Sequence, residues 1–124
     1  MANIRADKEI HVFFDSVNTP LSAAAVSPSI GTNGFQVLTL EVTGADASLT
    51  VQGCLNVIGR DGLLKPDAEC EWTNLAIINL SDYSVIDEIT EKGVYAIGIG
   101  DTARYRVNVT SVSGSATIIG FAGV

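Results

Sequence analysis

Apolar and polar side chains alternate along most of this chain, which is the two-residue period of a β-strand. Between positions 38 and 42, for example, Leu38, Leu40 and Val42 alternate with Thr39 and Glu41. The period of 3.6 residues that marks an amphipathic helix is nearly absent. The pattern predicts about seven or eight strands joined by short turns, an all-β fold of the antiparallel β-sandwich or jelly-roll type.

The same alternation assigns faces to the later strands. One expected buried face carries the residues at even spacing Trp72, Ala76, Ile78 and Leu80, and another carries Leu49, Val51, Leu55 and Val57. Gly53, inside the second run, suggests a β-bulge or a close approach of two backbones. Residues 94–99 and 105–109 read as a hairpin across Gly100-Asp101-Thr102, with Tyr105, Val107 and Val109 pointing to the same side.

The N-terminal third differs from the rest. Residues 8–14 read as a strand that is apolar on both faces, because Phe13 stands opposite Ile10, Val12 and Phe14. Residues 15–33 hold two prolines among Ser, Ala, Gly and Thr, which is typical of a linker or an extended arm. We therefore divide the chain into a strand with an arm (1–33) and a β-sandwich (34–124). An edge strand with two apolar faces needs a cover, so we expect an oligomer or capsid contact at Ile10, His11, Val12, Phe13 and Phe14.

Charge and composition narrow the classes of partner. The chain has 124 residues, 14 acidic and 7 basic, and a formal net charge of −7. Nucleic-acid backbones require clustered Lys and Arg, which are scattered here, so we expect no nucleic-acid partner. No apolar run reaches the roughly 20 residues of a membrane span, and the polar N-terminus has no signal-peptide core. These features lead us to expect cytoplasmic synthesis and no membrane partner.

Catalytic chemistry has little support. His11 is the single histidine and lies within an apolar strand, where packing or interface roles are commoner than acid–base catalysis. Residues 98–103 match the dinucleotide pattern G-x-G-x-x-A, but a strand pattern follows instead of the required helix. The crowded carboxylates Asp61, Asp67, Glu69 and Glu71 lack EF-hand spacing and fit a solvated loop better than a calcium site. We expect no enzyme, no cofactor and no metal site.

Two further sets of residues admit two interpretations each. Cys54 and Cys70 are expected to be free thiols in a reducing cytosol, with a disulfide as the less favoured alternative. The aromatic residues Trp72, Tyr83, Tyr95 and Tyr105 could form a sugar-binding platform, although we favour a place in the core. The core interpretation is preferred because only 6% of the residues are aromatic.

From about Gly34 to Val124 the order of elements resembles a family of small domains in tailed-phage structural modules. The matching stretches are Leu40-Glu41-Val42-Thr43-Gly44, Leu49-Thr50-Val51-Gln52-Gly53, Trp72, Lys92-Gly93-Val94-Tyr95, Ala103-Arg104-Tyr105-Arg106-Val107 and Ser113-Gly114-Ser115-Ala116-Thr117. The resemblance implies a β-sandwich in a virion protein such as a capsid decoration protein, a head fibre or a tail accessory. It implies no catalytic residue.

The leading hypothesis is therefore a non-enzymatic virion structural protein, assembled in the host cytoplasm. We expect it to form a symmetric homo-oligomer, with a trimer as the favoured state, and to contact phage capsid or tail proteins. The alternative is a carbohydrate-binding β-sandwich module. A weaker third hypothesis is a subunit of a non-viral cytoplasmic assembly.

Overall fold

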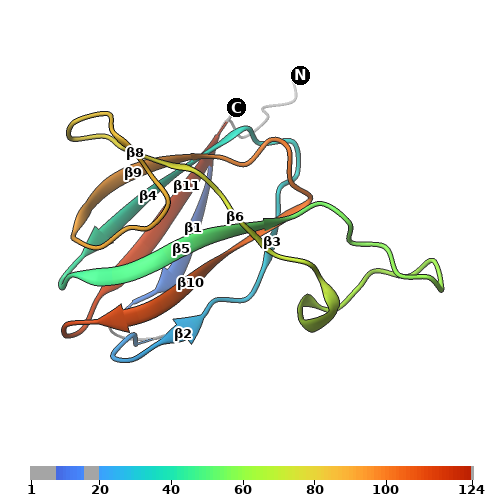
Figure 1. The fold of residues 1–124 in the computed structure, drawn as a ribbon, viewed down its shortest axis with the longest axis horizontal. Helices are drawn as coiled ribbons and strands as arrows, with labels where there is room; N and C mark the ends of the chain where they lie inside the picture. The colour runs from blue at the N-terminus through green and yellow to red at the C-terminus, as the bar shows by residue number, and fades with distance from the viewer. Residues whose placement is uncertain (1–7, 16–19, 124) are drawn as a thin grey trace, which may run out of the picture.

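The computed structural model describes residues 8–15 and 20–123, which form two antiparallel sheets packed face to face (Figure 1). The six-stranded sheet has the order β1 (Lys8–Phe14), β11 (Thr117–Gly123), β4 (Val37–Thr43), β9 (Gly93–Gly98), β7 (Ile77–Asn79) and β8 (Val85–Ile86). The second sheet has the order β2 (Ala25–Val26), β10 (Arg104–Val112), β5 (Ala47–Cys54) and β6 (Thr73–Asn74), and β3 (Ile30–Gly31) also pairs with β10. The predicted all-β antiparallel sandwich is confirmed, but the described residues form eleven strands and not the predicted seven or eight, because several short pairings of two or three residues add to the long strands.

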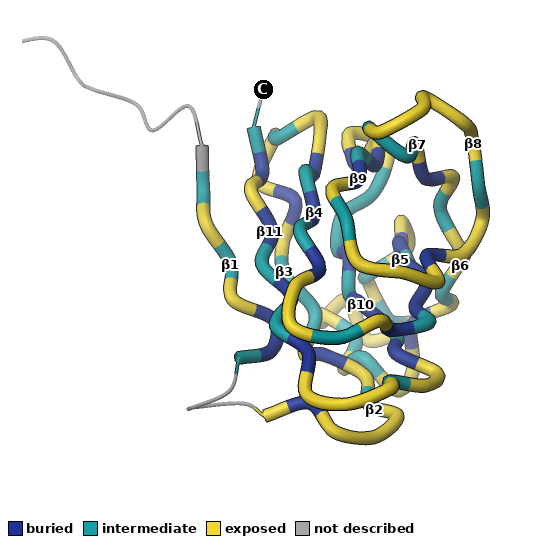
Figure 2. The backbone as a smooth tube through the Cα atoms, turned by 90° about the vertical axis from the view of Figure 1, so that its left-hand side faces the viewer, coloured by how far each residue is buried: buried dark blue, intermediate teal, exposed yellow. Residues whose placement is uncertain are grey.

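The core lies between the two sheets and is filled by the inward residues of the alternating strands. Leu38, Leu40 and Val42 of β4 are buried, as the alternation predicted. Tyr105, Val107 and Val109 of β10 face them from the second sheet and are equally buried. Figure 2 shows the resulting alternation of buried and half-buried residues along these strands. Among the described residues the only helix is the 3₁₀ turn η1 (Asp67–Glu69), and no helix there is long and apolar enough to cross a bilayer.

The expected hairpin of residues 94–99 and 105–109 is wrong. Strand β9 pairs with β4 and β7 in the six-stranded sheet, whereas β10 pairs with β5, β2 and β3 in the other. The turn around residues 100–103 therefore carries the chain from one sheet to the other. A short connection between two alternating segments is compatible with either arrangement, and packing of the core decides between them.

The face assigned to Trp72, Ala76, Ile78 and Leu80 is also wrong. Ile77 is the buried residue of this segment, whereas Ala76 and Ile78 are exposed. The reason is that the segment is not one strand, because β6 belongs to the second sheet and β7 to the first. The alternation restarts where the chain changes sheets.

Gly53 leaves no room for a side chain, but the atoms that crowd it belong to side chains and not to the predicted second backbone. A methyl group at this position would overlap the Thr102 methyl group and press on the Leu75 side chain. Strand β5 ends at Cys54, and the alternation ends with it: Cys54 is buried and Leu55 is exposed, opposite to the prediction.

The N-terminal third contributes strands to both sheets. β1 pairs with β11 over its whole length, and β2 and β3 pair with the middle and start of β10. Pro28 lies between β2 and β3, where it interrupts the ladder as expected of a proline. The described residues before position 34 are therefore part of the sandwich and not a separate arm. Residues 16–19 of the predicted arm, and residues 1–7, lie outside the described part of the chain.

Candidate functional site

The outer face of the six-stranded sheet is an unusually apolar surface. In an antiparallel sheet, directly paired residues point to the same side. One such row crosses all six strands and consists of Ile10, Phe121, Thr39, Ala96, Ile78 and Val85. The next row consists of Val12, Ile119, Glu41 and Val94, and Val37 stands in a third. We call these residues the outer face.

Several large aliphatic and aromatic side chains of the outer face are open to solvent. Ile10 is 64% exposed and Val12 51% exposed, and Val85, Val37, Val94, Ile78 and Phe121 are exposed as well. Glu41 is the only charged residue in the two longer rows, and the register places Lys8 in the row of Val37. The longest row spans five interstrand spacings, roughly 24 Å, and the long strands run about 20 Å, so the projected area is on the order of 500 Å². Patches of that size on a monomer are often functional.

A hollow of about 380 Å³ indents one end of this surface. It lies where the ends of β4 and the start of β9 meet, and Val94 and Glu41 of the outer face line it together with Lys92. A hollow beside exposed aliphatic residues offers a place for a side chain of a partner.

The five residues predicted as contacts separate into two groups. Ile10 and Val12 point outward on the outer face, whereas Phe13 and Phe14 are buried in the core. Both phenylalanines reach the core because the pairing of β1 with β11 shifts between Val12 and Phe14, a β-bulge that breaks the strict alternation. The two apolar faces of this segment are thereby explained: the core covers one and nothing in the described chain covers the other.

His11 belongs to the inner side of β1, at the margin between the two sheets. Its Nε2 lies 2.8 Å from a carboxylate oxygen of Glu9, and its ring contacts those of Phe13 and Tyr105. β1 is the edge of its sheet and has no strand partner on its outer side among the described residues. Charged side chains turned inward at such an edge disfavour uncontrolled pairing with other chains. His11 thus packs against two aromatic rings on the inner side of the edge strand.

The groove beside His11 offers no nucleophile. Ser27 also lines this groove, but its hydroxyl donates to the Pro28 carbonyl and accepts the N–H of Val107. The hydroxyl of Tyr105, close by, is buried without a hydrogen-bond partner among the described residues. Burial, with a contribution from the charge of Glu9, raises the pKa of Tyr105 to about 12, so this phenol stays neutral.

The crowded carboxylates do not converge on a common point. Asp67 accepts hydrogen bonds from Ser29 and lies 3.3 Å from Nη1 of Arg104. Burial acts to raise the pKa of Asp67, but the Ser29 hydrogen bonds and the Arg104 charge outweigh it and lower that pKa below its usual value. In the described part of the chain, no group of three or more His, Cys, Asp or Glu side chains is arranged to hold a metal ion.

The four aromatic residues considered for a sugar platform lie apart. Tyr95 and Tyr105 are core residues, and Tyr83 is exposed on the turn between β7 and β8. Trp72 is half-buried on the outside of the second sheet, where its Nε1 donates to the Asp67 carbonyl and the Arg106 guanidinium stacks 4.1 Å from its ring centroid. The expectation that Trp72 is a core residue is wrong, because β6 ends the second sheet and Trp72 lies just before it.

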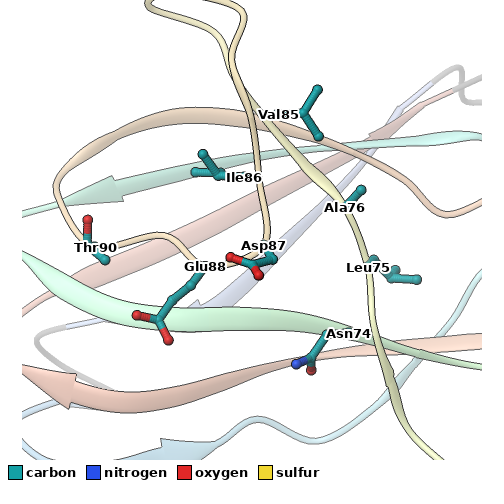
Figure 3. Close-up of a pocket in the computed structure, with 8 residues that line it drawn as sticks. All are labelled: Asn74, Leu75, Ala76, Val85, Ile86, Asp87, Glu88 and Thr90. Atoms are coloured by element: carbon teal, nitrogen blue, oxygen red, sulfur yellow. The ribbon is translucent and has the colours of Figure 1, made fainter.

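An open groove of about 720 Å³ lies between β6 and β8 (Figure 3). Asn74, Asp87, Glu88 and Thr90 supply its polar groups, and Val85, which also belongs to the outer face, stands at its rim. Histidine, cysteine and aromatic side chains are missing from its lining. Such a groove can hold water or a polar group, but its lining supplies no aromatic stacking surface.

No protein-family model matches this sequence, and no curated protein matches it. Two solved structures share its fold. The SPBc2 prophage-derived protein YomS aligns over 100% of both chains with a TM-score of 0.73 and 16% sequence identity. The PBSX exported protein XepA aligns with a TM-score of 0.70 and 17% identity, covering 97% of this chain and 39% of XepA. This chain thus corresponds in fold to the whole of YomS and to about two fifths of XepA.

Proposed function

We propose that this protein is a non-enzymatic structural component of a tailed-phage particle, of the capsid-decoration, head-fibre or tail-accessory type. It assembles in the host cytoplasm as a homo-oligomer, with a trimer as the favoured state, and joins other capsid or tail proteins. The contact surface is the outer face of the six-stranded sheet together with its edge strand β1.

The apolar outer face is the observation that carries this proposal. The solvent-exposed face of an antiparallel sheet normally carries polar side chains. Here aliphatic and aromatic residues occupy most positions of both long rows. Each buried square ångström of apolar surface contributes about 25 cal/mol. A face of this size therefore supplies on the order of 10 kcal/mol before the costs of association are subtracted.

The distribution of charge agrees with this arrangement. The chain carries a formal net charge of −7, yet Glu41 is the single charged residue in the two longer rows of the outer face. Depletion of charge is typical of the centre of an interface. An acidic remainder keeps a densely displayed protein soluble.

The fold comparisons support the phage setting. YomS is described as derived from the SPBc2 prophage, and its fold matches this chain over the full length of both proteins. XepA is described as a PBSX exported protein. A sandwich that forms the whole of one such protein and part of another suits a module that is used in larger assemblies.

Light scattering coupled to size exclusion tests the proposal on the full chain. The mass of the wild type in solution, measured by light scattering, is expected to be a multiple of the chain mass of 13.0 kDa. Ile10→Lys combined with Phe121→Lys places two charges at directly paired positions of the outer face and should yield a folded monomer. The matched control is Leu63→Lys, because Leu63 is 67% exposed, similar to Ile10, but lies in a loop away from the sheet.

The control should keep the wild-type mass, and circular dichroism should show that all three proteins retain their β signal. A wild type that is a strict monomer at high concentration would refute the homo-oligomer. Measurable affinity of that monomer for a glycan would instead favour the carbohydrate-binding module.

A further inference from the structure

A long loop outside the two sheets begins and ends at a cysteine. Strand β5 ends at Cys54, and the chain returns at Cys70, directly after η1, so that 15 residues lie between them. In Figure 1 this loop is the green segment that extends away from both sheets. The two arms of the loop are hydrogen-bonded to each other. The Lys65 N–H donates to the Val57 carbonyl, and Ile58 and Leu64 form an isolated antiparallel β-bridge.

The fold brings the two cysteines together at the base of this loop. Cys54 is paired with Arg104 across β5 and β10, and Nη1 of Arg104 lies 3.5 Å from Sγ of Cys70. Burial and the neighbouring Cys70 thiol raise the pKa of the Cys54 thiol above its ordinary value. Both are free, and both are buried, Cys54 with 2% and Cys70 with 9% of its surface exposed.

We propose that Cys54 and Cys70 form an intrachain disulfide once the protein meets a low-molecular-weight disulfide outside the reducing cytosol. Cys70, the more accessible thiol, loses its proton and attacks the reagent, forming a mixed disulfide and releasing one reagent thiol. Cys54 then loses its proton and attacks the sulfur of Cys70, which releases the second reagent thiol. The two cysteines are oxidised and the reagent disulfide is reduced to two thiols.

The surroundings favour the intrachain product. The sulfur that must attack second is already beside its target, so its effective concentration exceeds that of any external thiol. Burial of both sulfurs also hinders a second reagent molecule and a second protein chain. In the cytosol the reducing potential of the thiol pool would keep both cysteines as thiols.

The disulfide would fasten a loop that is otherwise held by polar contacts at its end. Arg104 donates to the Lys65 carbonyl and pairs with Asp67, and Asp67 bonds Ser29. Four aliphatic side chains of the loop are exposed: Leu55, Ile58, Leu63 and Leu64. A covalent closure of 15 residues restricts the unfolded chain, and the melting temperature should rise by up to about 10 °C.

Mass spectrometry and limited proteolysis of the full chain test the disulfide. The purified, reduced protein is incubated with oxidised glutathione, and free thiols are then alkylated. The expected product is about 2 Da lighter than the reduced protein and takes up no alkylating reagent. Trypsin cleavage after the exposed Arg60 separates Cys54 from Cys70, and the two fragments should stay joined until a reductant is added.

Two controls make the result specific. Wild type kept in reductant and cleaved after Arg60 should separate into its fragments at once under denaturing conditions. Cys54→Ser and Cys70→Ser should never give the lighter product and should hold at most one glutathione adduct. The proposal is overturned if the oxidised wild type keeps two alkylatable thiols, ends as a glutathione adduct, or forms disulfide-linked dimers instead.

Discussion

Truncation of Phe13 to alanine should destabilise the folded chain strongly, although the residue lies in an edge strand. Phe13 is 4% exposed and its ring fills the space above Gly120, where a methyl group would stand only 2.7 Å from Cε2 of Phe13. The ring also meets Tyr105 edge-on, with centroids 6.4 Å apart. The change leaves a cavity at the margin of the core.

The magnitude follows from the burial. Phenylalanine-to-alanine changes in a core cost about 3–5 kcal/mol, and the edge position of β1 allows some collapse around the gap. We therefore expect a loss of about 3–4 kcal/mol, or a fall in melting temperature of about 10–15 °C for a domain of this length. The matched control is Ile10→Ala on the same strand, which should cost less than about 1 kcal/mol in the monomer because Ile10 is mostly exposed.

Urea denaturation followed by circular dichroism, at several protein concentrations, measures both effects. The Phe13→Ala loss should be independent of concentration, because the cavity lies inside one chain. Any effect of Ile10→Ala that grows with concentration reports association, since binding between folded copies adds to apparent stability. If Phe13→Ala changes the free energy of unfolding by less than about 1 kcal/mol, β1 is not part of the core and the reasoning fails.

Two further predictions concern single side chains. Trp72→Ala should lower the free energy of unfolding, measured by urea denaturation, by only about 1–2 kcal/mol. It removes the hydrogen bond to the Asp67 carbonyl and the stacking of Arg106, but it opens no core cavity. A loss above about 3 kcal/mol would restore the core interpretation. Tyr105→Phe should leave stability at neutral pH unchanged or slightly higher, because it deletes a buried hydroxyl that has no partner among the described residues. Since the folded pKa of Tyr105 is raised to about 12, the wild type should lose stability as the pH rises from about 10, the pKa of an unfolded tyrosine, toward 12. The variant should lose less over that range in thermal melts, and equal losses would contradict the pKa shift.

Local alternation was sufficient to predict the fold class and some of the faces. Leu38, Leu40 and Val42 are buried as expected, and so are Tyr105, Val107 and Val109. The sequence also marked Gly53 as a special position, although it did not predict that the Thr102 and Leu75 side chains fill the space beside it. These features depend on neighbouring residues and on a period that strands impose directly.

The tertiary structure decided what depends on partners distant in the chain. Alternation does not say which sheet a strand joins, so the hairpin of residues 94–99 with 105–109 and the face of Trp72 were mispredicted. The bulge in β1 turned Phe13 and Phe14 to the same side, which a strict period of two excludes. The outer face exists only because the register of six strands aligns Ile10, Phe121 and Val85 across the sheet. The pairing of Cys54 with Arg104 likewise places two thiols side by side although 15 residues separate them. Such neighbours result from pairing between strands that are distant in the sequence. A short stretch of the chain does not contain the information that sets this pairing.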